Sequence, residues 1–411
     1  MRHLPSVILL IPAAREFDRG LRRGIVEYGK NHGPWTFYEE VPAYLHGLTP
    51  SQRLRSMRAW KADGVILLQD RLAEVKPLGI PMVVSIGTRR LGKGYTEIVC
   101  DNEAIGKLGA TTLLGLGLRH FGYCGLSGLE FSDHRAASFL RTIESAGREA
   151  HHYSHQASHP ERSWYDEQKQ LARWLGGLPK PAGILACNDD RARMLSEVCH
   201  LRGIRIPDDV AILGVDNDEQ VCSSANPPLS SIALATERGG YAAAALLDAL
   251  MRGRNTTAEL VAVSPTHVVS RQSTDTLAID DPILVRSLRF IRDNSDKAIR
   301  VADLRSVAWV SRRALQDRFK HFLGRTPMEE IHRCRLERIQ RLLIETDMTV
   351  GEIAMALGFD VDAHFSRFFS RQTGITPREY RRKNRVRIPV RVGHYSGPPG
   401  TVDSVTGMPA P

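Results

Sequence analysis

Apolar residues between positions 6 and 270 alternate between short continuous runs and longer segments in which they recur every three or four positions. The short runs predict buried strands, and the longer segments predict amphipathic helices. Strands are expected at residues 7–11, 64–68, 82–86, 98–100, 121–125, 183–187, 210–215, 232–234 and 267–269, and helices at 19–31, 104–116, 134–146, 165–175, 192–202 and 237–251. This alternation is typical of α/β folds with parallel, doubly wound sheets. Because about 265 residues are too many for one sheet, we expect two α/β lobes that face a cleft.

Beyond residue 283 the pattern becomes helical, and it occurs twice with a spacing of fifty positions. The first copy contains Leu315, Phe319, Gly324, Thr326 and Pro327, which recur as Phe365, Phe369, Gly374, Thr376 and Pro377. Two similar helical units in tandem within a basic segment are typical of proteins that read duplex DNA.

The second copy shows the signals of a helix, a tight turn and a second helix. Thr349 is a capping residue, and Glu352 completes a capping box for a helix that runs through Leu357. Gly358 supplies the left-handed residue that often ends a helix, and the next helix is predicted at residues 362–373. Phe365 and Phe369 lie four positions apart and therefore face the core. The sequence thus predicts an all-α helix-turn-helix unit whose second helix enters the major groove.

The first copy repeats this arrangement, with a leading helix at 301–307 and Ser311 as the N-cap of the second helix. It departs from the second copy in having Ala308-Trp309 where the second has Gly358-Phe359. A long amphipathic helix at 328–345 is predicted to join the two units. Its inward positions are Ile331, Leu336, Ile339, Leu342 and Leu343.

Residues on the outer faces of the two second helices are candidates for DNA contact. They are Arg312, Arg313, Gln316, Asp317 and Lys320 in the first unit, and Asp362, Ala363, Ser366 and Arg367 in the second. Arginine can bridge guanine, glutamine can pair with adenine, and an aspartate can accept from the amino group of cytosine. An outward arginine can equally contact phosphate, so the residues alone leave base reading and backbone contact open.

The positive charge of the chain is concentrated at one end. Residues 284–391 hold 24 Lys and Arg against 13 Asp and Glu, a net of +11, so the rest of this chain of net charge +10 sums to about −1. This indicates a nucleic-acid-binding module attached to a nearly neutral sensor. Six cysteines without metal-ligand spacing predict reduced, mostly buried thiols and a cytoplasmic protein. The apolar run at 7–11 is too short for a signal peptide or a membrane span, so no membrane partner is expected.

Polar side chains gather where the predicted strands end, which is where ligands bind in such folds. The candidates are Phe17, Asp18 and Arg19 after the first strand, Asp101 and Asn102 after the fourth, Arg135 near the fifth, Asn188 and Asp189 after the sixth, and Asp216 and Asn217 after the seventh. Their planar groups can each hold two adjacent hydroxyls, which favours a sugar, and Phe17 or Phe131 could cover its apolar face. Asp189 or Asp216 could instead serve as a helix cap.

Residues 284–384 resemble the DNA-binding domain of the AraC/XylS family of bacterial transcription activators. The specific motifs are Gly358-Phe359, then FSRFF from Phe365 and GITPREYR from Gly374. The resemblance implies two helix-turn-helix units held by a rigid helix, with recognition helices in successive major grooves. It further implies base contacts from Arg313, Gln316 and Asp317, and from Asp362, Ala363, His364 and Arg367.

Residues 6–270 resemble the lactose-repressor and periplasmic sugar-binding type of sensor. The matching segments are ILACNDDRAR from Ile184, VAILGVDNDE from Val210, and the Asp101-Asn102 step. By that comparison Arg135, Asn188 and Asp216 would contact sugar hydroxyls. Repressors of that group carry their DNA-binding helices at the N-terminus, whereas this chain has them at the other end. The combination implies a sugar sensor, with xylose or a related pentose as effector, fused to an AraC-type domain.

The chain is therefore expected to consist of a sensor at 1–273, a linker at 274–283, a DNA-binding domain at 284–384 and a disordered tail at 385–411. Asp281-Pro282 predicts the cap and first residue of a helix at 283–292. We expect a transcription regulator, an activator of a sugar-utilisation operon, that forms a homodimer on double-stranded DNA and contacts RNA polymerase.

Other functional classes find little support. His151, His152, His155 and His159 lie in what the pattern predicts to be a polar loop, without metal-ligand spacing, so no metal is expected. No cofactor loop and no nucleophile motif is present, so no cofactor, no catalytic residue and no enzyme activity are predicted. Two alternatives remain: a sensor for another small polar ligand or a protein partner, and, more remotely, a sugar-acting α/β enzyme fused to a DNA-binding domain.

Overall fold

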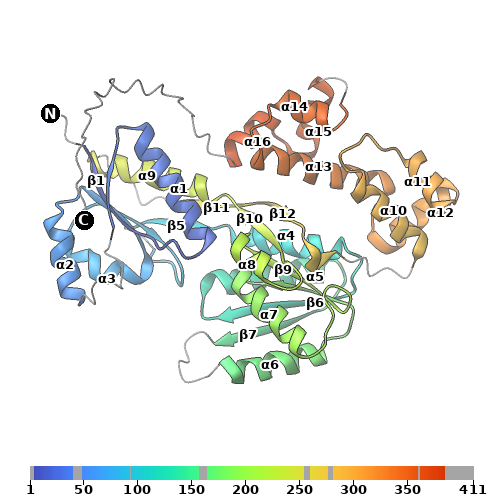
Figure 1. Ribbon diagram of the computed structural model, residues 1–411, viewed down its shortest axis with the longest axis horizontal. Coiled ribbons are helices and arrows are strands. Elements are labelled where there is room, and N and C mark those ends of the chain that lie inside the picture. Colours follow the sequence, from blue (N-terminus) through green and yellow to red (C-terminus); the bar gives the residue numbers. More distant parts are fainter. Residues whose placement is uncertain are drawn as a thin grey trace, which may run out of the picture.

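The computed structural model describes residues 4–39, 49–92, 94–156, 164–253, 260–275, 281–359 and 362–384. Within these ranges the chain forms two α/β lobes followed by a helical region (Figure 1). Two lobes and a helical double helix-turn-helix were predicted, and both are confirmed. The predicted tail at 385–411 and half of the predicted linker, residues 276–280, lie outside the described residues, so the division into domains stays a prediction.

The first lobe is built on a parallel six-stranded sheet of order β11-β5-β4-β3-β1-β2. Its apolar strands are buried on both faces, as parallel sheets require. Helix α9 returns from the second half of the sensor to pack along α1. The elements are β1 (Ser6–Leu10), α1 (Glu16–Asn31), β2 (Thr36–Tyr38), α2 (Pro50–Ala59), β3 (Gly64–Leu68), η1 (Gln69–Arg71), α3 (Leu72–Val75), η2 (Lys76–Leu78), β4 (Met82–Ser85), β5 (Thr96–Cys100), α9 (Thr236–Met251) and β11 (Leu260–Val263).

Close helix contact between α1 and α9 depends on glycine. A Cβ on Gly24 would lie 1.8 Å from the carbonyl oxygen of Glu237, and one on Gly240 would lie 2.0 Å from that of Leu21. Neither helix could approach the other this closely with a larger residue at these positions.

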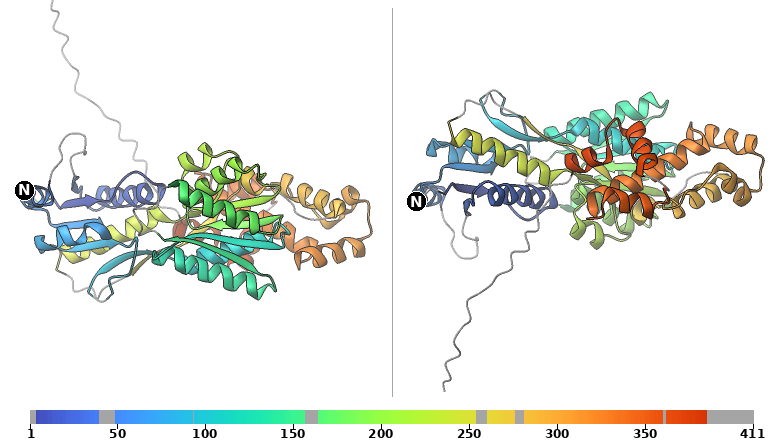
Figure 2. Two further views of the ribbon diagram at one scale, coloured as in Figure 1. Left: turned by 90° about the horizontal axis from the view of Figure 1, so that it is seen from below. Right: turned by 90° about the horizontal axis from the view of Figure 1, so that it is seen from above.

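The second lobe has a six-stranded sheet of order β12-β10-β9-β8-β6-β7, parallel except for the antiparallel pair β10 and β12. Figure 2 shows this lobe beside the first, with its helices on both faces of the sheet. The elements are α4 (Asn102–Leu114), β6 (His120–Ser127), α5 (Glu130–Ser145), β7 (Ala150–Gln156), α6 (Trp164–Gly177), β8 (Ala182–Ala186), α7 (Asp189–Leu201), β9 (Val210–Val215), α8 (Glu219–Ser224), β10 (Ser230–Leu234), β12 (Pro265–Val269) and η3 (Gln272–Thr274).

The chain crosses between the lobes three times, and the crossings are hydrogen-bonded to each other. The amide of Asp101 donates to the carbonyl of Val263, and the amide of Ala235 donates to that of Ser264, both at 2.9 Å. These short crossings form a hinge at one edge of the cleft between the lobes.

Three strands, β2, β7 and β11, were not predicted from the sequence. The prediction of a polar loop at His151, His152 and His155 was wrong, because these residues lie in β7 at the edge of the second sheet. An edge strand pairs on one side only, so it does not need the apolar run by which buried strands were recognised. His159 lies outside the described residues.

The helical region contains two units joined by one long helix, α13 (Pro327–Glu345). The first unit comprises α10 (Pro282–Asp293), α11 (Val301–Ala308) and α12 (Arg312–Leu323), and the second α14 (Val350–Ala356), α15 (Asp362–Thr373) and α16 (Pro377–Asn384). Each unit packs its own core against one end of α13. The predicted caps at Asp281, Ser311 and Thr349 are confirmed, including the capping box between Thr349 and Glu352. The sequence prediction missed α16.

The second unit is held to α13 through its turn. The Arg335 guanidinium lies 3.9 Å from the centre of the Phe359 ring and donates to the carbonyl of Leu357 at 2.5 Å. Gly358, with φ of 67°, provides the left-handed residue of this turn as expected.

In the first unit the left-handed residue is Trp309, with φ of 53° and ψ of 41°. A side chain with a Cβ costs about 1–2 kcal/mol in this conformation. Trp309 is also 82% exposed, so its indole buries little surface in return. The turn therefore forms despite this residue, because α11 and α12 pack on both sides of it.

Replacing Trp309 by glycine is expected to raise the free energy of unfolding by up to about 1 kcal/mol, because relief of the left-handed strain exceeds the entropy cost of glycine. Chemical denaturation of the full chain measures this. Trp309→Ala is the control, since it removes the same indole and keeps the Cβ. Equal stability of the two variants would contradict the explanation.

Candidate functional site

A cavity of about 390 Å³ lies between the two lobes, at the carboxyl ends of their strands. This is within the size range of small-molecule sites. Its lining comes from both lobes and includes Phe17, Gly87, Thr88, Arg90, Cys100, Asn102, Glu130, Phe131, His134, Arg135, Asn188 and Asp216.

Arg135 is the buried cation of this cavity, with 3% of its surface exposed. Its Nε donates to Oδ1 of Asn102 at 2.9 Å, and its Nη1 donates to the carbonyl of Cys187 at 2.5 Å. The guanidinium also lies 5.0 Å from the centre of the Phe131 ring. These contacts hold a rigid fork of donors in a fixed place in the cavity.

Asp216 is the half-buried carboxylate of this cavity, and the charge of Arg135 lies near it. Burial raises its pKa to about 7, although the nearby Arg135 charge opposes that increase. Its backbone has φ of 103°, and Asn217 follows with φ of 51°. Two successive non-glycine residues with positive φ are uncommon, and such strain concentrates at functional positions.

Of the ten strand-end candidates for ligand contact, the structure brings together five in this cavity, namely Phe17, Asn102, Arg135, Asn188 and Asp216. Asn188 also accepts from the amide of Arg191 at 2.9 Å and caps α7. Neither Asp189 nor Asp216 has the capping role that was considered for them.

The other five candidates are not among the described residues that line the cavity, and they are Asp18, Arg19, Asp101, Asp189 and Asn217. Asp101 caps α4 by accepting from the amide of Ala104 at 3.0 Å. Asp189 accepts from the Ser231 hydroxyl at 2.6 Å and the Asp218 amide at 2.7 Å, and burial raises its pKa. Burial likewise raises the pKa of Asp18 to about 6.

Sequence reasoning missed several residues of the cavity wall. Thr88, Arg90, Glu130 and His134 lie in loops or the first turn of α5, where no periodic pattern marks them. Asn102 and Phe131 were noticed in the sequence, and the structure brings both into contact with Arg135.

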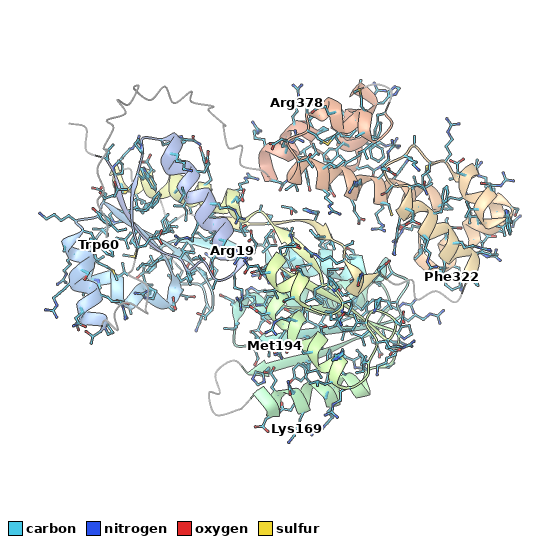
Figure 3. All side chains as sticks on the ribbon, in the orientation of Figure 1. Arg19, Trp60, Lys169, Met194, Phe322 and Arg378 are labelled. Atoms are coloured by element: carbon cyan, nitrogen blue, oxygen red, sulfur yellow. The ribbon has the colours of Figure 1, made fainter. Side chains whose placement is uncertain are left out.

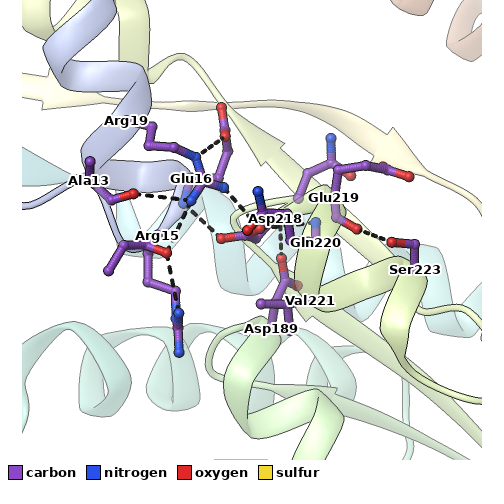
Figure 4. A network of polar contacts seen from close by, with 12 residues as sticks. Ala13, Arg15, Glu16, Arg19, Asp189, Asp218, Glu219, Gln220, Val221 and Ser223 are labelled. Carbon is purple, nitrogen blue, oxygen red and sulfur yellow. Dashed lines mark hydrogen bonds and ion pairs between the residues drawn. The ribbon is translucent and has the colours of Figure 1, made fainter. Parts of the chain in front are cut away.

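A second polar cluster joins the lobes beside the cavity, and Figure 4 shows it around Asp218. The Asp218 carboxylate accepts from the backbone amide of Glu16 at 2.9 Å and from Nη2 of Arg19 at 2.9 Å. It also accepts from the amide of Gln220 at 3.1 Å, which makes it the N-cap of α8. Arg15, which precedes α1, has no side-chain capping bond. One buried carboxylate of the second lobe therefore caps helices in both lobes.

Arg19 and Arg15 extend this cluster. Arg19 lies where α1 approaches the second lobe (Figure 3), and its Nε pairs with Glu16 at 3.1 Å. Arg15 pairs across the cleft with Asp190 at 2.6 Å. The predicted ligand residue Arg19 thus contacts the other lobe.

Replacing Asp218 by alanine is expected to lower the free energy of unfolding of the sensor by about 2–4 kcal/mol, because two helix caps and a buried ion pair are lost together. Thermal unfolding of the full chain measures this. Asp208→Ala is the control, since Asp208 is exposed and pairs only with the exposed Arg205 at 3.6 Å. Equal melting temperatures for the two variants would contradict the shared cap.

The helix-turn-helix units present their predicted DNA-facing residues outward. Arg312, Arg313, Asp317 and Lys320 on α12 are exposed, as are Ala363, His364 and Arg367 on α15, while Gln316 and Ser366 are half-buried. The side chain of Asp362 lies outside the described residues. Leu315, Phe319, Phe365 and Phe369 are buried, as predicted.

The cysteines are free thiols, and all but the half-buried Cys100 are buried. In the described part of the chain, no group of three or more His, Cys, Asp or Glu residues is arranged to hold a metal ion. No helix in those same ranges has both the length and the apolar composition needed to span a membrane.

Fold and sites together define a DNA-binding transcription regulator that carries its own ligand-sensing domain. Residues 110–274 match a periplasmic binding protein-like domain, and residues 306–383 match a helix-turn-helix domain of the AraC type. Along nearly its whole length the chain is similar to xylose operon regulatory proteins. It is 29% identical to that of Escherichia coli (strain K12) over 391 residues, which cover 92% of this chain and 97% of the relative.

Two further comparisons agree. The xylose operon regulatory protein of Haemophilus influenzae is 29% identical over 386 residues, covering 92% of this chain and 98% of the relative. The solved structure of the xylose-binding transcription activator xylR matches with a TM-score of 0.58 and 28% identity, over 94% of this chain and 100% of the other. The order of a sensor followed by a DNA-binding domain is therefore shared with these regulators.

Proposed function

We propose that the interlobe cavity binds a sugar, with xylose or a related pentose as the effector, and that this binding changes the affinity of the chain for DNA. The observation that carries the proposal is that buried Arg135 and half-buried Asp216 line the same cavity, with Asp216 on a strained backbone. A bidentate donor and a bidentate acceptor suit adjacent hydroxyls, and Asn102 and Asn188 add amides that can both donate and accept.

The cavity also offers apolar contact on both sides. Phe17 comes from the first lobe and Phe131 from the second, so the two lobes can cover opposite faces of a sugar ring. The similarity to a protein described as xylose-binding supports a pentose.

Closure of the two lobes on the ligand is the proposed signal. A ligand shifts such an equilibrium only by its differential affinity for the open and closed states, typically ~1–3 kcal/mol. The Asp218 cluster already joins the lobes, so it would favour the closed state together with the ligand.

We further propose that α12 and α15 read DNA through the outward residues named above, with Arg313, Gln316, Asp317, Asp362, Ala363, His364 and Arg367 at the bases. Arg312, Lys320 and Ser366 would contact the backbone. We also propose that the protein acts in the cytoplasm as a homodimer. It activates transcription through RNA polymerase and has no enzymatic activity.

Replacing Arg367 by alanine is expected to reduce discrimination between the operator and unrelated DNA by about 1–3 kcal/mol, because a bidentate base contact is lost. Lys320→Ala, which removes a phosphate contact, should weaken binding to all sequences alike. Fluorescence anisotropy with both duplexes measures this. An equal loss on both duplexes for Arg367→Ala would make it a backbone contact.

A thermal-shift screen of the full chain against pentoses and hexoses tests the sugar proposal. A true ligand at one hundred times its Kd should stabilise the protein by about 2.7 kcal/mol. No shift with any sugar, while DNA binding is intact, would favour a different small polar ligand or a protein partner. Chemical conversion of a bound sugar would instead support the alternative of a sugar-acting α/β enzyme fused to a DNA-binding domain.

A further inference from the structure

A larger cavity, of about 1250 Å³, lies between the sensor and the second helix-turn-helix unit. We call it the interdomain groove. One wall belongs to the first lobe and contains Asn31 at the end of α1, with Arg238 and Tyr241 on α9. The other wall consists of the start of α14, Ser366 of α15, and the first residues of α16. Figures 1 and 2 show α16 beside the N-terminal end of α9.

The groove is strongly basic. Arg238 on the sensor wall faces Arg378, Arg381 and Arg382 on the helix-turn-helix wall, against the single carboxylate of Asp347. Arg238, Arg378 and Arg382 are exposed, and Figure 3 shows Arg378 at the surface of the second unit.

The start of α16 adds to the positive potential of the groove. Thr376 caps α16 and lines the groove together with Pro377. The amides of a first turn carry partial positive charge and favour anions. These positions lie beside Ser366 of the recognition helix, so an anion held here would belong to the same DNA that the helix reads.

The helix-turn-helix wall is fixed to the second lobe. The Tyr380 hydroxyl donates to the carbonyl of Thr266 on β12 at 3.0 Å, and α13 packs against β12. Arg238, in contrast, is carried by α9 of the first lobe. The width of the groove consequently depends on the angle between the lobes.

We propose that the interdomain groove binds the phosphate backbone of DNA, and that Arg238 of the sensor contacts that backbone directly. The proposal rests on the DNA-binding function of the helical region and extends the DNA surface onto the sensor. Three exposed arginines, Arg238, Arg378 and Arg382, and the start of α16 complement a polyanionic strand, while Arg381 is buried and donates to the carbonyl of Leu343. A change of lobe angle then alters DNA affinity at the groove itself, since it moves Arg238 relative to Arg382.

The test is a salt titration of DNA binding by the full chain. Backbone contacts act on any sequence, so a labelled duplex of about 40 base pairs without an operator serves as the probe. Each phosphate contact contributes about −0.9 to the slope of log K against log salt. We expect Arg238→Ala to make the slope shallower by about 0.9 and to weaken binding about threefold or more at low salt. Arg238→Glu should weaken it further.

Arg141→Ala is the matched control, because Arg141 is an exposed arginine on α5 outside the groove, and its loss removes the same charge. Thermal melts verify that the variants fold. Identical slopes for Arg238→Ala and Arg141→Ala would overturn the proposal while leaving DNA binding intact. Tighter binding by Arg238→Ala would also overturn it, since the sensor would then exclude DNA. Absence of DNA binding by the unaltered chain would instead overturn the underlying function.

Discussion

Replacing Asp216 by asparagine is expected to abolish stabilisation by the effector sugar while leaving the empty protein folded. The substitution keeps the shape of the side chain but removes the half-buried carboxylate that lines the cavity. Hydrogen bonds to a charged group contribute about 1.5–3 kcal/mol, so the affinity for the sugar should fall by about tenfold to more than a hundredfold. Isothermal titration and thermal shifts with the sugar measure the loss.

The empty Asp216→Asn protein is expected to be more stable than the unaltered one above pH 7. Burial raises the pKa of Asp216 to about 7, from 3.8 in the unfolded chain. The folded state therefore favours the protonated carboxyl, and this contribution is present below pH 3.8 and is lost as the pH rises through 7. The difference of about 3 pKa units corresponds to a cost of at most about 4 kcal/mol for ionised Asp216 at pH 8, reduced by the partial exposure of the side chain, and the asparagine variant does not carry this cost.

The same carboxyl predicts a pH-dependent affinity for the sugar. Hydroxyl donors stabilise the ionised form, so binding should strengthen as the pH rises through about 7 and weaken by up to tenfold per unit below it. The asparagine variant should show no such trend. Asp133→Asn, an exposed acid on the same helix as Arg135, is the control and should behave like the unaltered chain. Undiminished sugar binding by Asp216→Asn would exclude this residue from the site.

Replacing Glu330 by glutamine is expected to lower the free energy of unfolding of the helical region by about 2–3 kcal/mol at pH 7. Glu330 lies in the first turn of α13 with 1% of its surface exposed. It accepts from Nη2 of Arg333 at 2.7 Å and from Nε of Arg325. The side-chain hydrogen bond and charge of Arg333, together with Arg325, lower its pKa to about 2 despite its burial.

The effect of Glu330→Gln on the free energy of unfolding should depend on pH. A carboxyl whose pKa is depressed on folding contributes stability above its unfolded pKa of about 4.5, and that contribution is lost as the pH falls from there to about 2. The difference between the unaltered chain and Glu330→Gln should therefore shrink over this window. Denaturation at a series of pH values measures it.

Glu337→Gln is the control for Glu330, because Glu337 pairs with the same Arg333 at 2.5 Å but is half exposed. Exposed ion pairs of this kind contribute little, so its loss should cost well under 1 kcal/mol. If both variants lost the same stability, burial of Glu330 would not be the cause.

Much of the architecture could be predicted from the sequence, because it depends on interactions between residues that are close together in the chain. Continuous apolar runs mark the inner strands of both sheets, and the capping box of Thr349 and Glu352 marks the start of a helix. The pair Leu315 and Phe319, repeated fifty positions later as Phe365 and Phe369, and the net charge of the last third indicate the DNA-binding units. By contrast, the edge strand β7 and the short strand β2 carry no such pattern, since they are paired on one side only.

The candidate site was predicted only in part, for a related reason. Strand ends could be located, so Phe17, Arg135, Asn188 and Asp216 were found. The sequence could not show that the carboxylates of Asp101 and Asp189 accept hydrogen bonds from backbone and side-chain donors within the protein. Tertiary packing determines which donors lie beside them.

The sequence by itself determined the alternation of inner strands and helices, the double helix-turn-helix and the asymmetry of charge, because hydrophobic periodicity, caps and net charge are properties of neighbouring residues. Only the tertiary structure decided that α9 and β11 return to the first lobe, that Asp218 caps α1 from the opposite lobe, and that Arg238 faces the second helix-turn-helix unit. Each of these joins residues far apart in the chain. These contacts depend on how whole helices and strands pack against each other, which cannot be predicted from the pattern of neighbouring residues.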